Sequence, residues 1–151
     1  LSLHDALPIL KFESFYDFNA IPQKRLKFAV IVSKYKGKLV FVKHKKRDTF
    51  EIPGGTREPR EHIDKTAKRE LIEETGAKRF KIEPVAIYGI KKNDYRYFGK
   101  LFYAEIFEFG VLPNMEIREV TFFDKTPENL TYPLIQPHIL NKIEEYIKSK
   151  Q

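Results

Sequence analysis

Hydrophobic residues gather in short runs rich in β-branched side chains, and such runs predict β-strands. Residues 28–33 (FAVIVS) and 38–42 (KLVFV) are two of these runs, and Lys36-Gly37 between them predicts a turn. Further strands are expected at 82–90, 97–107 and 120–123, with a short extended piece at 49–52 before Pro53-Gly54-Gly55.

Two other segments have the helical period. From about residue 61 to residue 75, apolar side chains recur four apart, and Gly76 follows where a glycine closes a helix. That apolar face consists of Ile63, Ala67 and Leu71. The second stripe has Pro137 near its start and consists of Ile139, Leu140, Ile143, Tyr146 and Ile147. Strands, helix, strands and helix in this order predict an α/β fold with helices packed on a mixed sheet.

Composition narrows the classes of function. The chain has 151 residues and no internal repeat or linker, which predicts one domain. It has no cysteine, which excludes disulfide scaffolds, thiolate metal sites and cysteine nucleophiles, and we expect a cytoplasmic protein. No apolar run reaches the ~18 residues of a membrane span, so no membrane partner is expected. The net charge of +7 favours polyanionic ligands such as nucleotides or nucleic acid.

The first nine residues differ from the rest. Residues 1–9 read LSLHDALPI, the peptide that a common sequencing-adapter DNA encodes. We therefore expect residues 1–9 to be a non-native segment and residues 10–151 to form the domain.

One face of the first predicted helix carries three acids. Glu70, Glu73 and Glu74 lie at i, i+3 and i+4, so their carboxylates project within a sector of roughly 100°. Clustered anions repel one another unless cations hold them, and hard oxygen donors suit Mg²⁺ or Mn²⁺. Taken alone, the pattern also fits a solvated acidic helix face.

The residues around these acids have a defined spacing. From Gly55, five residues lead to Glu61, seven more lead to Arg69, and the run Glu70-Leu71-Ile72-Glu73-Glu74-Thr75-Gly76-Ala77 follows. Every specified position matches the signature G-x5-E-x7-R-E-U-x-E-E-x-G-U, in which U is apolar. Such a match arises by chance on the order of 10⁻⁷ per chain of this length. The chain therefore resembles the Nudix hydrolases of the MutT-like type, from about Phe28 to the C-terminal helix.

The resemblance implies the Nudix fold, an α/β/α sandwich, and hydrolysis of a nucleoside diphosphate linked to another group. It implies a Mg²⁺ site, in which Mn²⁺ can substitute, held by Glu73, Glu74, Glu70 and the carbonyl of Gly54. Glu70, Glu73 and Arg69 match catalytic positions. Gly55, Glu61 and Gly76 match positions that shape the motif, and Arg69 with Glu61 matches a pair that orients it. His62 stands where members often have a Ser or Thr helix cap, which leaves the stability of the helix start open.

MutT-like members bring a further glutamate from a loop that leads into a late strand. Aligning Phe122 with the aromatic residue that opens that strand puts Glu116 at this metal position, with Glu119 as the alternative.

Four residues are candidates for substrate contacts: Lys45 and Arg47, in a basic run, and Tyr132 and Gln136, where MutT-like members place nucleobase contacts. We expect a nucleoside triphosphate as substrate. The alternatives are a dinucleoside polyphosphate or an RNA 5′ end, and a non-catalytic nucleotide-binding regulator. The sequence leaves the particular nucleotide and the oligomeric state open.

Overall fold

A mixed seven-stranded sheet forms the centre of the molecule. The computed structural model describes residues 10–113 and 116–151. The strands are β1 (Lys11–Tyr16), β2 (Leu26–Tyr35), β3 (Lys38–His44), β4 (Gly54–Thr56), β5 (Ala77–Lys92), β6 (Tyr95–Phe109) and β7 (Ile117–Phe123). The helices are the 3₁₀ turn η2 (Gln23–Arg25), α1 (Ile63–Thr75) and α2 (Gln136–Ser149). The strand order is β1-β5-β6-β2-β3-β7, with β4 paired to β2, and the β2–β6 pair is parallel.

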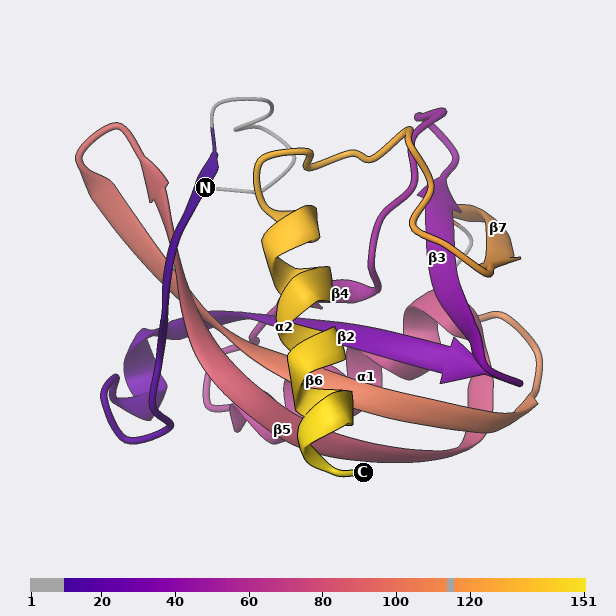
Figure 1. Cartoon of the computed structure of the whole chain (residues 1–151), viewed down its shortest axis with the longest axis horizontal. Helices are drawn as coiled ribbons and strands as arrows, with labels where there is room; N and C mark the ends of the chain where they lie inside the picture. The colour runs from indigo at the N-terminus through magenta and orange to yellow at the C-terminus, as the bar shows by residue number, and fades with distance from the viewer. Residues whose placement is uncertain (1–9, 114–115) are drawn as a thin grey trace.

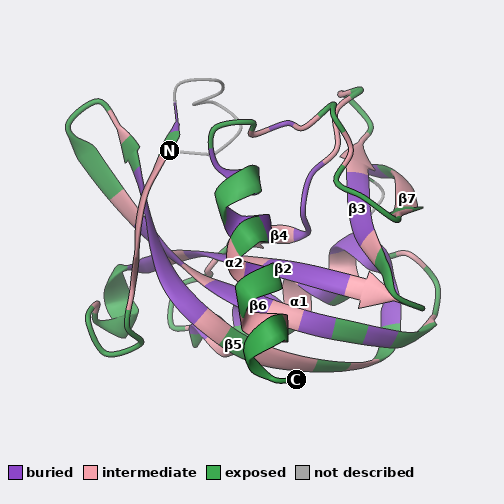
Figure 2. Ribbon diagram, in the orientation of Figure 1, coloured by how far each residue is buried: buried purple, intermediate pink, exposed green. Residues whose placement is uncertain are grey.

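Helices α1 and α2 cover opposite faces of this sheet (Figure 1). Successive side chains of β2 alternate between the two faces. Phe28 and Val32 pack in the same apolar cluster as residues of α2, whereas Ala29 and Ile31 pack with the apolar face of α1. Burial follows the same division, since the sheet is buried where the helices cross it and α2 is exposed on its outer side (Figure 2). The predicted α/β/α sandwich is confirmed.

Helix α1 has defined ends. His62 serves as the cap in place of Ser or Thr, because its Nδ1 accepts the N–H of Asp64 at 3.1 Å. Gly76 ends the helix in the left-handed region at φ 75°, as its position predicted. The apolar face of α1 is fully buried, so the acidic face of the same helix turns toward β4.

Several elements differ from those expected. Strands β5 and β6 are longer than predicted and form a hairpin that turns at Asn93, where φ is 54°. Strands β1 and β4 and the turn η2 were not expected. Strand β4 has a glycine-rich sequence without strand propensity, and its pairing with β2 stabilises it instead. Residues 49–52 contribute only isolated bridges at Phe50 and Glu51.

The segment 1–9, expected to be non-native, lies outside the described residues. Neither α1 nor α2, the two α-helices of the described part of the chain, has the length and apolar character of a membrane span.

Candidate active site

Strand β4 passes against the acidic face of α1, and its glycines make this approach close. A Cβ placed on Gly55 would lie 2.2 Å from Cδ of Glu70 and 2.3 Å from its Oε1. A Cβ on Gly54 would lie 2.5 Å from the carbonyl oxygen of Ala29 in β2. Side chains at either position would therefore separate the acids of α1 from the sheet.

Arg69 ties α1 to the loop that precedes it. Its guanidinium donates from Nε to Oε2 of Glu61 at 2.8 Å and from Nη2 to Oε1 of Glu61 at 3.0 Å. Nη2 also donates to the carbonyl oxygen of Thr56 at 3.1 Å. The charged pair holds the pKa of Glu61 well below its usual range, at about 2. The predicted contact between Arg69 and Glu61 is present, and it fixes β4 relative to the helix.

The same guanidinium faces two of the three predicted acids. Nη1 of Arg69 donates to Oε1 of Glu70 at 2.9 Å and to Oε2 of Glu73 at 3.3 Å. Burial raises the pKa of Glu70 to about 7, and the charge of Glu74 adds to this rise. Arg69 opposes the rise only in part. Burial is thus the main cause of the rise, and the neighbouring carboxylates of Glu74 and Glu73 add to it.

Glu74 is buried and held on both oxygens. Its Oε1 accepts the N–H of Gly54 at 2.8 Å, and its Oε2 lies 3.3 Å from Nε2 of His44. Burial raises the pKa of Glu74, while His44 and the Gly54 N–H act in the opposite direction. The same His44 atom lies 3.4 Å from Oε2 of Glu51. The two carboxylates raise the pKa of His44 to about 10, so the imidazole is positively charged at neutral pH.

Neither His44 nor Glu51 was predicted as a site residue. The strand β3 carries His44 to the helix face, and the segment before Gly54 carries Glu51 there. Arg47 completes this group, since its Nη1 donates to Oε1 of Glu51 at 2.8 Å. The sequence contained one signal, since Glu51 is the single acid of the extended piece 49–52, which follows the basic run at 43–47. That signal does not say which acid the basic run faces.

The donor atoms fit a divalent cation in their chemistry. Carboxylate oxygens of α1 and the backbone of Gly54 are hard ligands of the kind that Mg²⁺ and Mn²⁺ bind. Within residues 10–113 and 116–151, no three acidic or histidine side chains are already gathered as a metal site. Glu70 and Glu73 contact Arg69 and Glu74 contacts His44, so binding a metal ion would require these side chains to turn.

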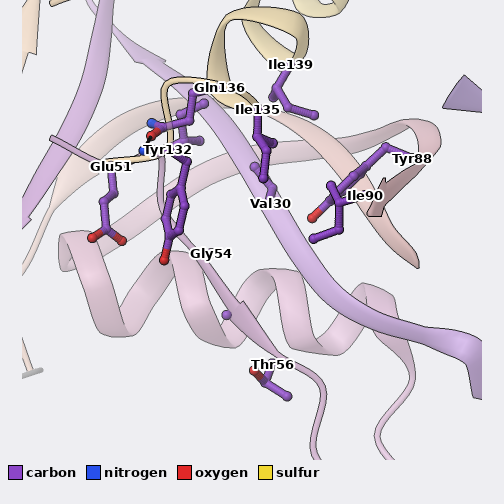
Figure 3. Close-up of a pocket in the computed structure, with 12 residues that line it drawn as sticks. Val30, Glu51, Gly54, Thr56, Tyr88, Ile90, Tyr132, Ile135, Gln136 and Ile139 are labelled. Atoms are coloured by element: carbon purple, nitrogen blue, oxygen red, sulfur yellow. Dashed lines mark hydrogen bonds between the residues drawn. The ribbon is translucent and has the colours of Figure 1, made fainter. Parts of the chain in front are cut away.

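A pocket of about 110 Å³ opens between β4 and the start of α2 (Figure 3). Tyr132 and Gln136 both line it, together with Glu51 and the glycines of β4. Oε1 of Gln136 accepts the N–H of Tyr132 at 2.8 Å. Its Nε2 is buried and has no hydrogen-bond partner among the described residues. The two predicted base contacts therefore share one pocket beside the acids of α1.

The two candidates from the basic run lie differently. Arg47 contacts the pocket indirectly, because it donates to Glu51, which lines it. Burial raises the pKa of Tyr132, and Arg47 opposes this rise in part. Lys45 is exposed on the segment after β3 and does not line this pocket.

Strand β7 begins at Ile117, so Phe122 does not open it as the alignment assumed. Glu116 nevertheless precedes the strand directly, and its carbonyl oxygen accepts the N–H of Lys45 at 2.8 Å. This contact brings Glu116 beside the end of β3, which carries His44. Glu119 lies within β7 and accepts the hydroxyl of Thr121 at 2.6 Å. Glu119 also lies beside the end of β3, since it pairs with Lys43, so the choice between the two acids stays a prediction.

Comparison with known proteins identifies the class. Residues 23–139 match the sequence pattern of the NUDIX domain family, and the chain belongs to that family.

Particular relatives show how far the similarity extends. The protein named "Putative 8-oxo-dGTP diphosphatase YtkD" of Bacillus subtilis (strain 168) is 28% identical over 102 residues, which are 67% of this chain. The match spans 64% of that relative's length, or somewhat under two thirds. The pyrophosphohydrolase BsRppH of Bacillus subtilis superposes with a TM-score of 0.75 at 23% identity, covering 91% of this chain and 90% of that one. A UDP-X diphosphatase gives 0.69 at 21% identity, covering 89% of this chain and 68% of that one. The two structures share the fold.

Proposed function

We propose that the chain is a pyrophosphohydrolase that cleaves a phosphoanhydride bond of a nucleoside triphosphate or a related nucleotide. Its cofactor is Mg²⁺, with Mn²⁺ as a substitute. The observation that carries the proposal is the packing of two acids of α1 against β4, since Glu70 lies against Gly55 and Glu74 accepts the N–H of Gly54. The relative YtkD, whose name is that of an 8-oxo-dGTP diphosphatase, supports a nucleotide substrate.

The metal would be held by Glu70, Glu73, Glu74 and the carbonyl of Gly54, with Glu116 from the segment before β7. When bound, it neutralises phosphate oxygens and lowers the pKa of a water molecule. Arg69 holds Glu70 and Glu73 at the edge of β4 and keeps their charges from repelling each other fully.

Glu70 takes the proton of the attacking water. Its Oε1 accepts from Arg69 and its carboxylate lies against Gly55 of β4, so a proton acceptor is held at the site. The oxygen of water forms a bond to phosphorus, the bridging P–O bond breaks, and the released phosphate group leaves with the bridging oxygen and its electron pair. Tyr132 and Gln136 line the pocket that receives the base, and Arg47 donates to Glu51 in the wall of that pocket. Lys45, which lies outside the pocket, stays a candidate for a phosphate contact.

Two alternatives have different chemistry. A dinucleoside polyphosphate or an RNA 5′ end presents the same anhydride bond with a longer substituent, so the same acids would act on it. A non-catalytic regulator would bind a nucleotide without cleaving it, and the presence of all three acids on α1 argues against this alternative. A cytoplasmic location stays a prediction.

The test is a panel of nucleotides incubated with the protein and Mg²⁺, with products separated by anion exchange. We expect a nucleoside monophosphate and pyrophosphate from at least one triphosphate. Glu73→Gln should slow this reaction at least about a hundredfold, whereas the surface control Lys148→Gln should not change it. Release of a nucleoside diphosphate and phosphate instead, or an unchanged rate in Glu73→Gln, would overturn the proposal. Tight nucleotide binding without turnover would favour the regulator.

A further inference from the structure

A second pocket lies beside the end of β4 at Thr56. Its volume is about 300 Å³, and it is lined by Lys24, Arg25, Lys27, Thr56, Arg57, Arg96, Tyr97 and Phe98. Five of these residues are cationic and none is acidic. A pocket lined by charges of one sign raises the local concentration of ions of the opposite sign. The lining therefore favours an anion.

The charges of this pocket are largely uncompensated. Within the described part of the chain, Lys24, Arg25 and Lys27 form no ion pair, and Arg96 pairs with Glu13 at 2.6 Å. Arg57 donates to three carbonyl oxygens, those of Leu26 at 2.9 Å, Lys24 at 3.1 Å and Glu61 at 3.2 Å. These neutral acceptors fix the guanidinium without cancelling its charge. A guanidinium has five N–H donors, so Arg57 keeps donors for a ligand.

Aromatic rings hold two of the flexible cations in place. The guanidinium of Arg25 lies 4.8 Å from the ring centre of Phe98, and Nζ of Lys27 lies 5.3 Å from that of Tyr97. Both distances are within the range of a cation–π interaction. The two side chains are therefore ordered before a ligand binds, which lowers the entropy cost of binding.

The second pocket and the base pocket share one lining residue. Thr56 lines both pockets, and its carbonyl oxygen accepts from Arg69, which holds Glu70 and Glu73. Figure 3 shows Thr56 at the end of β4, apart from Tyr132 and Gln136 at the base pocket. A pocket that shares Thr56 with the candidate active site is placed to receive a part of the substrate beyond the nucleotide held in the base pocket.

We propose that this pocket binds a phosphate group in the distal part of an extended substrate, the phosphodiester next to the cleaved 5′ anhydride of an oligoribonucleotide or the far phosphates of a dinucleoside polyphosphate. The proposal rests on the proposed function for the position of the anhydride. Its chemistry is common to both sources, since each presents phosphate oxyanions beyond the first nucleotide.

The test removes the charges of Lys24 and Lys27, whose side chains donate no hydrogen bond within the described part of the chain. Lys24→Gln/Lys27→Gln is compared with Lys81→Gln/Lys148→Gln, which removes two exposed charges of β5 and α2 outside the pocket. The probes are a six-nucleotide oligoribonucleotide with a 5′ monophosphate and a 3′ fluorophore, and diadenosine tetraphosphate. Affinity is measured by fluorescence anisotropy for the first and by calorimetry for the second, in Ca²⁺ so that turnover does not interfere.

We expect the pocket variant to weaken oligoribonucleotide binding at least about tenfold, and the control variant less than twofold. The slope of log Kd against log salt should fall by about 1.4 for two lost contacts to a single strand. Lys24→Arg/Lys27→Arg should restore binding, and thermal melting should show that each variant folds. Loss for the oligoribonucleotide alone assigns the pocket to a nucleic-acid backbone. Weaker binding of both probes assigns the pocket to phosphates of either source. Weaker binding of diadenosine tetraphosphate alone assigns it to the polyphosphate.

Equal effects of the pocket and control variants on both probes would overturn the proposal. The binding measurement needs no hydrolysis. If the pocket variant weakens binding but the protein cleaves no nucleotide, the proposed function is refuted and the phosphate-binding role of the pocket is retained. If the protein cleaves a nucleotide but the pocket variant binds as the control variant does, the proposed function is retained and the role of the pocket is refuted.

Discussion

The closest approach between β4 and α1 offers a sharp test of how the site is built. In Gly55→Ala, the new Cβ would lie 2.2 Å from Cδ and 2.3–2.5 Å from the oxygens of Glu70. Carbon atoms in ordinary contact stand about 3.5–4.0 Å apart, so the carboxylate must withdraw by roughly 1.3 Å or more. Gly55 has no positive φ, so alanine fits its backbone without strain.

The size of the effect follows from this displacement. A catalytic group misplaced by about 1 Å can lose roughly a hundredfold in rate, which is about 2.7 kcal/mol of transition-state stabilisation. The folded state should lose little, because the displaced group is the end of a flexible side chain. The reduced freedom of the unfolded chain adds about 0.4–1 kcal/mol of stability. We expect kcat to fall about a hundredfold, with the free energy of unfolding within about 1 kcal/mol of the parent.

Gly54→Ala is the matched control. There the new Cβ would lie 2.5 Å from the carbonyl oxygen of Ala29 and 3.2 Å from Cα of Val30, so backbone and not a side chain must move. Overpacking of this kind costs about 1–3 kcal/mol. The assay combines kcat on the substrate found in the nucleotide panel with urea unfolding followed by circular dichroism. A folded Gly55→Ala enzyme with kcat within threefold of the parent would refute the reasoning that Glu70 must lie against β4.

Three further changes test other parts of the structure. Leu71→Ala removes a fully buried side chain of α1, and the urea midpoint should report a loss of about 2–5 kcal/mol. Because the pKa of Glu61 is lowered from 4.5 to about 2, its contribution to stability is complete above the higher value and is lost as pH falls toward the lower one. Between those values, the midpoint of Glu61→Gln should therefore change less with pH than that of the parent. His44→Gln leaves buried Glu74 without its charged partner, and calorimetry should show a lower Tm; an unchanged Tm would remove His44 from the support of that acid.

The sequence predicted those features that depend on local spacing. The helix α1 and its end at Gly76 follow from periodicity and from one glycine, and both are properties of neighbouring residues. Strand β4 was missed because its glycines have no strand propensity, and only the adjacent β2 gives it partners. The capping by His62 could not be predicted from the sequence, because the orientation of its ring depends on the folded loop.

In the candidate site, too, local contacts could be predicted from the sequence and contacts between distant segments could not. The acids of α1 and their contact with Arg69 follow from positions along one helix and its preceding loop. The contacts of His44 with Glu51 and Glu74 join three separate segments, β3, the bridge before β4 and α1, and depend on sheet register. Periodicity carries no information about such contacts, because it describes each segment by itself. The cationic pocket beside Thr56 was missed for the same reason, since η2, β2, β4 and β6 meet there.

The central claim is that metal held by the acids of α1 makes this protein a pyrophosphohydrolase. A time course by ³¹P NMR, with a nucleoside triphosphate, Mg²⁺ and either no chelator or excess EDTA, tests it most directly. The account predicts growing signals of a nucleoside monophosphate and pyrophosphate with Mg²⁺, none with EDTA, and their return when Mg²⁺ is restored. The same products at the same rate in excess EDTA would contradict it.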